Sequence, residues 1–347
     1  MTSACSIQTL DLKPGIPAVR MANDVISVDI LPDKGADIYS LVHRPSNIDV
    51  MLKLPAGLRA PGQGMLSSNS QTAWLEMYEG GWQEILPNGG DPCHYKGVEL
   101  NFHGESTTLP WHYAIIKNSA DEVIVDFSVQ LYRSPLHITR RMSLAAGSDT
   151  LKLDERVTNQ AGEPIDLMWG HHPAFGAPFL SGDCRIHTNA KTILVDAASN
   201  TELLPLAQSA WPLAQTLDGL GRDLSRVPPQ TNRSATYCYL KDFEGAPWYA
   251  IVNSALKLGV GLTCSPEIFK CFWLWQEMGA SAGFPFYSRT YTMAIEPWTS
   301  YPGHGLTSVM NSTQTHLTLS PGQVISAQLN ISLFRYDANT PIPRMTL

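Results

Sequence analysis

The segment 122–131, EVIVDFSVQL, decides the fold class of this chain. Every second residue in it is apolar: Val123, Val125, Phe127, Val129 and Leu131. Successive side chains of a β-strand point to opposite faces, so this alternation predicts a strand with one buried and one exposed face. The same period of two recurs in 151–157 and 329–333. Strands are therefore expected along the whole chain.

Helical patterns do not stand out in this sequence. We find no stretch of about twelve residues with apolar side chains at the i, i+3, i+4, i+7 spacing of an amphipathic helix. Instead, 26 glycines and 25 prolines interrupt the chain at short intervals, which is typical of β-sandwiches. These features predict an all-β fold of antiparallel sheets. For 200–232, which is poor in strand formers, we expect a long loop with room for a short helix.

Composition bounds the organisation of the protein. Apolar residues make up 44% of the 347 positions, and no shift in composition marks a boundary. We therefore predict a single domain over 1–347, with 1–20 as an N-terminal extension. Six cysteines occur without a C-x-x-C pair, which argues against a zinc knuckle or a disulfide scaffold.

Charge and hydropathy exclude several kinds of partner. The net charge is −7 and no Lys/Arg cluster is present, so nucleic acid is not an expected partner. No segment reaches the roughly 18 to 20 apolar residues that cross a bilayer. The segment MTSACSIQTLDLKPG (1–15) lacks the basic and apolar parts of a signal peptide. We expect a cytoplasmic protein without membrane contact.

Four segments gather polar, titratable and aromatic residues that a strand pattern does not require. A carboxylate at the end of an apolar strand is a candidate general base, because burial raises its pKa toward neutral. Histidine exchanges its proton nearest to neutral pH. The segments are GGWQEILPNGG (80–90) with its continuation to His103, GHHPAFG (170–176), CFWLWQEMG (271–279) and MAIEPWTSYPG (293–303).

Each candidate residue in these segments also has a purely structural interpretation. Glu296 follows three apolar residues and could be a buried base or an edge residue with a surface partner. His171 and His172 would point to opposite faces of a strand, so at most one of them lines a given site and the other is structural. Trp275 and Trp298 could stack on a sugar or pack in the core.

The uncharged polar candidates also have two possible interpretations. Gln83, Asn88 and Gln276 could bind hydroxyl groups, or they could stabilise turns. A two-histidine, one-carboxylate metal site made by His103, by His171 or His172, and by Glu296 is a further alternative. No histidine pair at i, i+2 supports it, and we predict neither a metal nor a cofactor.

Three motifs give the chain a specific resemblance. FHGE (102–105), GHHPAFG (170–176) and IEPWTSYPG (295–303) resemble, in order and spacing, the aldose 1-epimerase (galactose mutarotase-like) family. The resemblance extends from about Val25 to Leu333. It implies a large antiparallel β-sandwich, the galactose mutarotase-like supersandwich.

The resemblance also implies roles for individual residues. His103 matches the family's sugar-contacting histidine, His172 its general acid and Glu296 its general base. His171 stands in the place of a neighbouring asparagine and is expected to bind substrate. Where galactose-specific members have an arginine, Gln83 or Asn88 would have to substitute. The family's sugar-binding aspartate has no matched position.

The implied activity is the interconversion of the anomers of a free sugar by acid/base opening and closing of its ring. The partner would be a small carbohydrate, and the protein would be a monomer or a homodimer. The carboxylate of Glu296 would favour the imidazolium form of His172. Two alternatives stay open on the same scaffold: another sugar isomerase, epimerase or lyase, and a carbohydrate-binding protein without catalysis.

Overall fold

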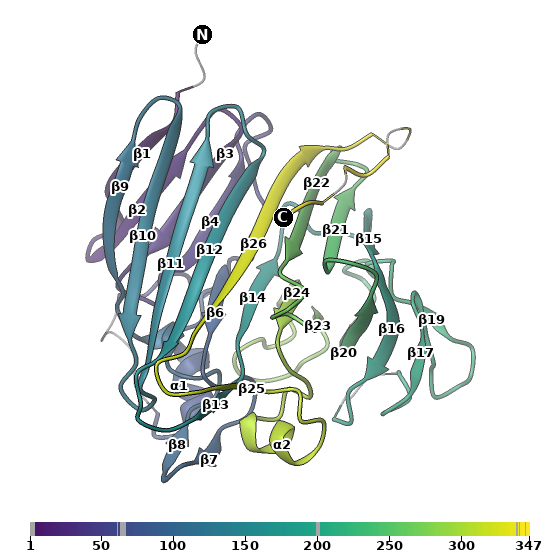
Figure 1. Ribbon diagram of the computed structural model, residues 1–347. Helices are drawn as coiled ribbons and strands as arrows, with labels where there is room; N and C mark the ends of the chain where they lie inside the picture. The colour runs from purple at the N-terminus through teal and green to yellow at the C-terminus, as the bar shows by residue number, and fades with distance from the viewer. Residues whose placement is uncertain are drawn as a thin grey trace.

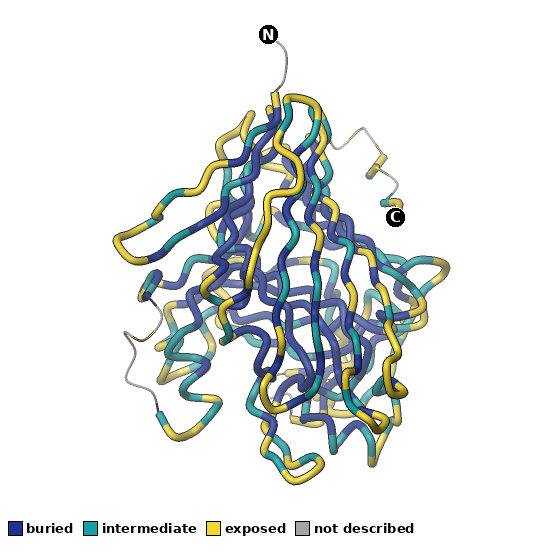
Figure 2. The backbone as a smooth tube through the Cα atoms, turned by 60° about the vertical axis from the view of Figure 1, so that its left-hand side comes forward, coloured by how far each residue is buried: buried dark blue, intermediate teal, exposed yellow. Residues whose placement is uncertain are grey.

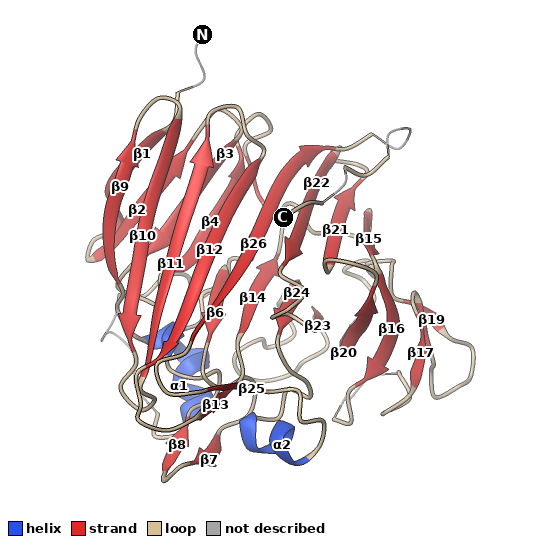
Figure 3. Cartoon of the chain, viewed as in Figure 1, coloured by secondary structure: helices blue, strands red, loops and turns tan. Residues whose placement is uncertain are grey.

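Two large sheets, packed face to face, make up most of the protein (Figure 1, Figure 3). This computed structural model describes residues 4–60, 62, 67–198, 202–337, 339, 341–343 and 345–347. Neighbouring strands in both sheets run antiparallel. The expected all-β, antiparallel sandwich is confirmed.

The first sheet has twelve strands. Its order is β1 (Ser6–Lys13), β2 (Ile16–Ala22), β3 (Ile26–Leu31), β4 (Asp37–His43), β6 (Trp82–Ile85), β14 (Gly170–Phe175), β24 (Tyr291–Trp298), β23 (Cys271–Met278), β20 (Ser234–Phe243), β16 (Ala190–Val195) and β17 (Gln208–Ala210), with β5 (Ile48–Asp49) paired to β4. Because β1 and β2 belong to this sheet and bury Ile7 and Val19, the prediction that 1–20 form an extension is wrong for its described residues. The single domain stays a prediction.

The second sheet has eight strands. Its order is β15 (Cys184–Thr188), β21 (Trp248–Asn253), β22 (Leu258–Cys264), β26 (Val324–Arg335), β12 (Thr150–Asn159), β11 (Leu136–Ala145), β10 (Glu122–Gln130) and β9 (His112–Asn118). The three segments with a period of two lie in β10, β12 and β26, which confirms that those strands were identified correctly. In β10 the alternating residues Val123, Val125, Phe127 and Val129 are buried.

Three strand pairs and three short helices complete the fold. The pairs are β7 (Cys93–Tyr95) with β8 (Val98–Leu100), β13 (Ile165–Leu167) with β25 (Leu317–Leu319), and β18 (Leu213–Ala214) with β19 (Arg222–Asp223). The helices are α1 (Ser70–Met77), the 3-10 helix η1 (Ser106–Thr108) and α2 (Leu306–Asn311). Within 202–232 the structure contains only β17, β18 and β19, so the short helix expected there is not formed in the described part.

The core lies between the two sheets. It joins residues of the eight-stranded sheet, such as Val125 and Leu153, to residues of the twelve-stranded sheet, such as Leu274 and Ile295. Figure 2 shows the buried strand centres and the exposed connections around them. Full burial of one such side chain contributes about 1.5–3 kcal/mol. Among the described helices, none is long and apolar enough to span a membrane.

Candidate functional site

The outer face of the twelve-stranded sheet, turned away from the core, carries the candidate catalytic pair. Antiparallel pairing of Gly170 with Trp298 and of Ala174 with Ala294 sets His172 across from Glu296. His172 Nε2 lies 3.7 Å from Glu296 Oε1, and both side chains are almost fully buried. An imidazole and a carboxyl from distant parts of the chain therefore meet at one point.

His103 reaches the same place from a loop. Its backbone has a left-handed φ of 54°, and its ring centre lies 5.9 Å from that of His172. The Gly90 N–H donates to His103 Nδ1 over 3.2 Å. With Nδ1 accepting, a neutral His103 carries its proton on Nε2. Burial, and then the charge of His172, keep the pKa of His103 well below its usual range, so the ring is a neutral donor.

Burial sets the charge state of the catalytic pair. It lowers the pKa of His172 to about 4 and raises the pKa of Glu296 to about 8. The expectation that Glu296 would favour a charged His172 is therefore wrong for the unliganded protein. The reason is that desolvation of both groups outweighs their attraction across 3.7 Å. Near neutral pH the pair holds one proton, and that proton resides on Glu296.

Trp298 forms a hydrogen bond with Glu296. Its Nε1–H donates to Glu296 Oε2 over 3.0 Å, which favours the carboxylate form. The indole is fully buried and stacks on Trp273, with ring centres 3.9 Å apart and planes inclined by 12°. The interpretation of Trp298 as a wall of the sugar pocket is corrected, because the side chain has no exposed surface.

His171 points into the core, away from His172, as strand alternation requires. Trp82 Nε1 donates to His171 Nδ1 over 3.1 Å, and His171 Nε2 lies 2.9 Å from Glu155 Oε2. Burial lowers the pKa of His171 to about 3, so a neutral ring donates from Nε2 to Glu155. The prediction that His171 binds substrate is therefore wrong.

Two predicted amide contacts are also structural. Asn88 Nδ2 donates to the carbonyl oxygens of Asp91 and Asn101, each over 2.9 Å, and Asn88 Oδ1 accepts from the Leu306 N–H over 2.7 Å. Gln276 lies on the core face of β23, where it pairs with Met293 and donates to the Met293 sulfur. Neither amide lines the pocket, so both predictions are corrected.

Gln83 and Trp275 do lie with the catalytic pair. Gln83 is the register partner of His172 across β6 and β14. The ring centre of Trp275 lies 5.6 Å from that of His172. Both positions share a sheet face with His172, so the structure is compatible with contact to a ligand. Their binding roles stay predictions.

A cavity of about 310 Å³ opens beside these residues. Its lining includes Lys34, Trp74, Tyr78, Gln83 and Phe102. The ring of Tyr78 lies 5.7 Å from that of His172, and the ring of Trp74 lies 4.7 Å from that of His103. The cavity and the catalytic pair therefore share one aromatic wall.

That wall comes from α1, which sequence analysis missed. The helix begins where the Asn69 side chain accepts from the Thr72 N–H over 2.9 Å, and it buries Trp74. Tyr78 follows at its C-terminus. Asn before a helix is a recognised capping signal, but eight residues are too few to show a helical period. Lys34, from the loop after β3, carried no signal in the sequence.

A cluster of possible metal ligands lies in the core. Glu84, Glu155 and His171 each offer one donor atom, all within 4.8 Å of one another. The Arg140 guanidinium already bonds Glu84 Oε2 over 2.5 Å and Glu155 Oε1 over 3.1 Å. The guanidinium of Arg140 therefore already supplies the positive charge between the two carboxylates, where a metal ion would otherwise bind. No such donor group among the described residues includes His103, His172 and Glu296.

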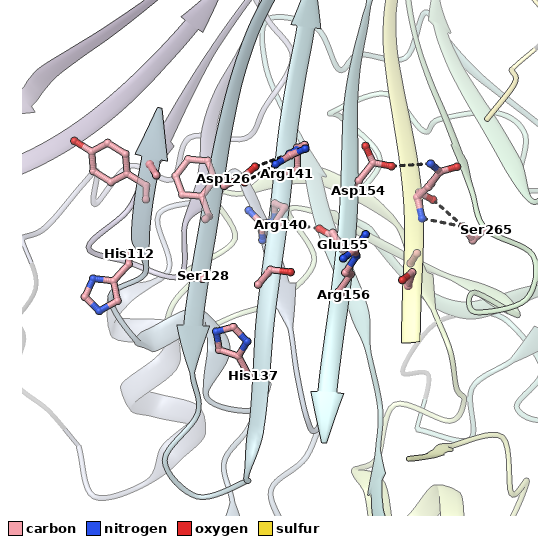
Figure 4. A pocket seen from close by; sticks show the side chains of 17 residues that line it. His112, Asp126, Ser128, His137, Arg140, Arg141, Asp154, Glu155, Arg156 and Ser265 are labelled. Carbon is pink, nitrogen blue, oxygen red and sulfur yellow. Dashed lines mark hydrogen bonds and ion pairs between the residues drawn. The ribbon is translucent and has the colours of Figure 1, made fainter. Parts of the chain in front are cut away.

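A larger hollow, of about 840 Å³, lies elsewhere, on the outer face of the eight-stranded sheet (Figure 4). Several of the charged side chains that line it bond to one another or to a neighbouring amide. Arg141 forms two bonds of 2.7 Å with Asp126, and Gln328 donates to Asp154. His112 and His137 also line this hollow, but among the described residues neither forms an ion pair with a carboxylate, so we do not assign the active site to it.

Comparison with solved structures supports the same fold. A protein from Klebsiella pneumoniae, provisionally named an aldose 1-epimerase, superposes with a TM-score of 0.72 at 17% identity, over 96% of this chain and 84% of that one. A galactose mutarotase-like protein from Clostridium acetobutylicum gives a TM-score of 0.62 at 15% identity, over 96% and 99%. The resemblance to this fold family is confirmed.

Sequence comparison adds the family. No curated protein matches the chain. The model of the family described as "Domain of unknown function (DUF4432)" matches residues 13–333. The chain therefore belongs to the DUF4432 family.

Proposed function

We propose that this protein interconverts the anomers of a free sugar, as an aldose 1-epimerase-like isomerase. The observation that carries the proposal is the buried pair His172 and Glu296, 3.7 Å apart on one sheet face beside a cavity of sugar size. The fold shared with mutarotase-like proteins supports the proposal but does not decide the activity.

Ring opening needs one proton to leave O1 and one to reach the ring oxygen O5, so that the C1–O5 bond breaks. In our proposal Glu296 takes the O1 proton and His172 donates to O5. Rotation about C1–C2 then presents the other face of the aldehyde, and the same groups run in reverse to close the ring. The net proton count is unchanged, and no redox step is involved.

The proton on Glu296 fits this mechanism once the sugar binds. A donated hydrogen bond from O1–H stabilises the carboxylate form of Glu296, as the Trp298 N–H already does. This bond brings the pKa of Glu296 closer to that of His172, and the less populated form, with the shared proton on His172, is the one that opens the ring. His103, a neutral Nε2–H donor, steadies the charge that develops on the sugar.

Access to the pair is part of the proposal. His172 and Glu296 retain 6% and 2% of their surface, and Trp74 and Tyr78 stand next to His172. A sugar in the cavity meets Tyr78 and Gln83 first. Turnover therefore includes a side-chain movement of Trp74 or Tyr78.

The test is NMR exchange spectroscopy, with polarimetry, on a panel of free aldoses. Glu296→Gln and His172→Ala should each lower kcat by at least about 10²-fold. His94→Ala and Glu163→Gln change exposed residues of the same types and should retain activity. Near wild-type turnover in either pair variant, with the fold intact by circular dichroism, would remove that residue from the mechanism. Sugar binding without exchange in the wild type would favour a carbohydrate-binding protein.

A further inference from the structure

Buried polar atoms without a hydrogen-bond partner gather in and beside this cavity. Among the residues that the structure describes, four side-chain atoms here are of this kind: Tyr78 OH and Gln83 Oε1 on residues that line the cavity, and Asp37 Oδ1 and His172 Nδ1 on residues next to them. A buried polar atom without a partner costs about 1–3 kcal/mol, so native proteins hold few of them. Their concentration at one place indicates a surface built to bond a ligand.

A ligand that satisfies these unpartnered atoms must supply hydrogen-bond donors. Asp37 Oδ1 and Gln83 Oε1 can only accept, because Gln83 Nε2 already donates to Asp37 Oδ2 and to the Gly80 carbonyl oxygen, over 3.1 and 2.8 Å. The Tyr78 hydroxyl can donate or accept. Sugar hydroxyl groups supply such donors, whereas an ionised phosphate or carboxylate supplies acceptors.

The positive charge of Lys34, the basic residue that lines the cavity, is balanced by two carboxylates. Lys34 Nζ lies 2.8 Å from Asp37 Oδ2 and 2.7 Å from Glu79 Oε1, and all three side chains are largely buried. Burial alone would favour neutral Lys34, but the two carboxylates outweigh it and raise the pKa of the ammonium group. Burial also raises the pKa of Glu79, to about 7. Lys34 is the lone Lys or Arg among the described lining residues, and its charge is already matched.

The group formed by Lys34, Asp37 and Glu79 lies close to Tyr78, which also lies close to Glu296. The pKa of Tyr78 is raised by burial and then by the charges of Glu296, Glu79 and Asp37, in that order. The Tyr78 hydroxyl is therefore close enough to Glu296, Glu79 and Asp37 to be affected by their charges. Tyr78 lines the cavity, so a ligand there contacts the residue that separates it from the candidate pair.

We propose that the cavity is the recognition subsite for a neutral polyhydroxylated sugar and rejects sugar phosphates and uronates. This inference rests on the proposed function for the location of the reacting carbon. The physical reason is that an added anion would face Asp37 and Glu79 without a free cation, while neutral hydroxyls would bond Asp37, Tyr78 and Gln83.

The first experiment compares an uncharged hexose, its 6-phosphate and the corresponding uronate. Anomer exchange is followed by NMR, and binding is measured separately by calorimetry. We expect kcat/KM and affinity for the neutral sugar to exceed those for both anions by at least about tenfold. Faster exchange of an anion overturns the subsite and leaves the proposed function standing. Binding of the neutral sugar alone, without exchange, overturns the proposed function and supports the subsite.

Tyr78→Phe tests the subsite without disturbing the fold. The variant removes a hydroxyl that has no hydrogen-bond partner in the described part of the chain, so thermal stability should hold or rise slightly. Loss of one hydrogen bond to the sugar should weaken binding about five- to thirtyfold. Tyr249→Phe is the matched control, because the Tyr249 hydroxyl is equally buried and unpartnered but belongs to the core between the sheets. Equal affinity in both variants would overturn the role of Tyr78.

Glu79→Gln tests the charge argument. It leaves Lys34 with one carboxylate and makes the cavity more positive, so the preference for neutral hexose over its 6-phosphate should fall at least about threefold. Glu163→Gln, in an exposed pair with Lys96, should leave the preference unchanged. An unaltered preference in folded Glu79→Gln would contradict the charge argument. If this variant does not fold, Tyr78→Phe still decides the proposal.

Discussion

Removal of the Trp298 hydrogen bond should move the alkaline limb of the pH profile of kcat/KM, which we assign to Glu296, to higher pH. The Trp298 N–H stabilises the carboxylate form of Glu296 over 3.0 Å in a dry site. A hydrogen bond to a charged group is worth about 1.5–3 kcal/mol, and one pKa unit corresponds to about 1.4 kcal/mol. Trp298→Phe should therefore raise the pKa of Glu296, now about 8, by about one to two units.

The assay is kcat/KM for anomer exchange between about pH 5 and 10, because this parameter reports the free enzyme's groups. Each rate is corrected for spontaneous mutarotation at the same pH. Loss of the indole also costs packing, of order 1–3 kcal/mol of stability. Unfolding is therefore followed in parallel, and the profile is recorded well below the melting temperature.

Trp273→Phe is the matched control. It removes the other indole of the stacked pair, whose N–H bonds the Ser300 carbonyl oxygen and not Glu296. The two variants should lose similar stability, while only Trp298→Phe moves the alkaline limb. An unmoved limb in Trp298→Phe, or the same shift in both variants, would refute the assignment of that limb to Glu296.

Further outcomes follow from the same contacts. In the wild type, kcat/KM recorded from about pH 3 to 10 should be bell-shaped, falling below about pH 4, where His172 and Glu296 are both protonated, and above about pH 8, where neither is; a single limb over this wider range, in a protein that stays folded, would contradict the shared proton. Asn88→Ala should lower the free energy of unfolding by about 2–4 kcal/mol without changing KM, as chemical denaturation and kinetics would show. Arg140→Met should cost about 3–5 kcal/mol, because it leaves Glu84 and Glu155 buried without their cation, and an unchanged denaturation midpoint would count against that ion pair.

Sequence patterns identified the fold class through local physics. Alternation in 122–131 reports one buried face directly, and β10 has that face. The same alternation shows that neighbouring residues point to opposite faces of the sheet, but it does not show which of them points to the core. His172 and Trp275 therefore lie at the pocket, while their neighbours His171 and Gln276 lie in the core.

The rest of the candidate site depends on contacts that no local pattern encodes. Lys34 and Glu79 are 45 positions apart and meet through the path of the chain between β3 and β6. Trp298 lies two residues from Glu296 on the same face of β24, so its nearness was visible, but its full burial was not. Burial also reversed the expected charge of the pair, because desolvation depends on everything packed around it.

Two consecutive histidines tie the reaction to the opposite sheet. His171 bonds Glu155 of the eight-stranded sheet, and its peptide neighbour His172 carries the imidazole that we propose as catalytic. The spacing between the layers therefore contributes to the position of His172, the proton donor that we propose. We expect substitutions around Glu155, in the far layer, to change the turnover proposed for the outer face.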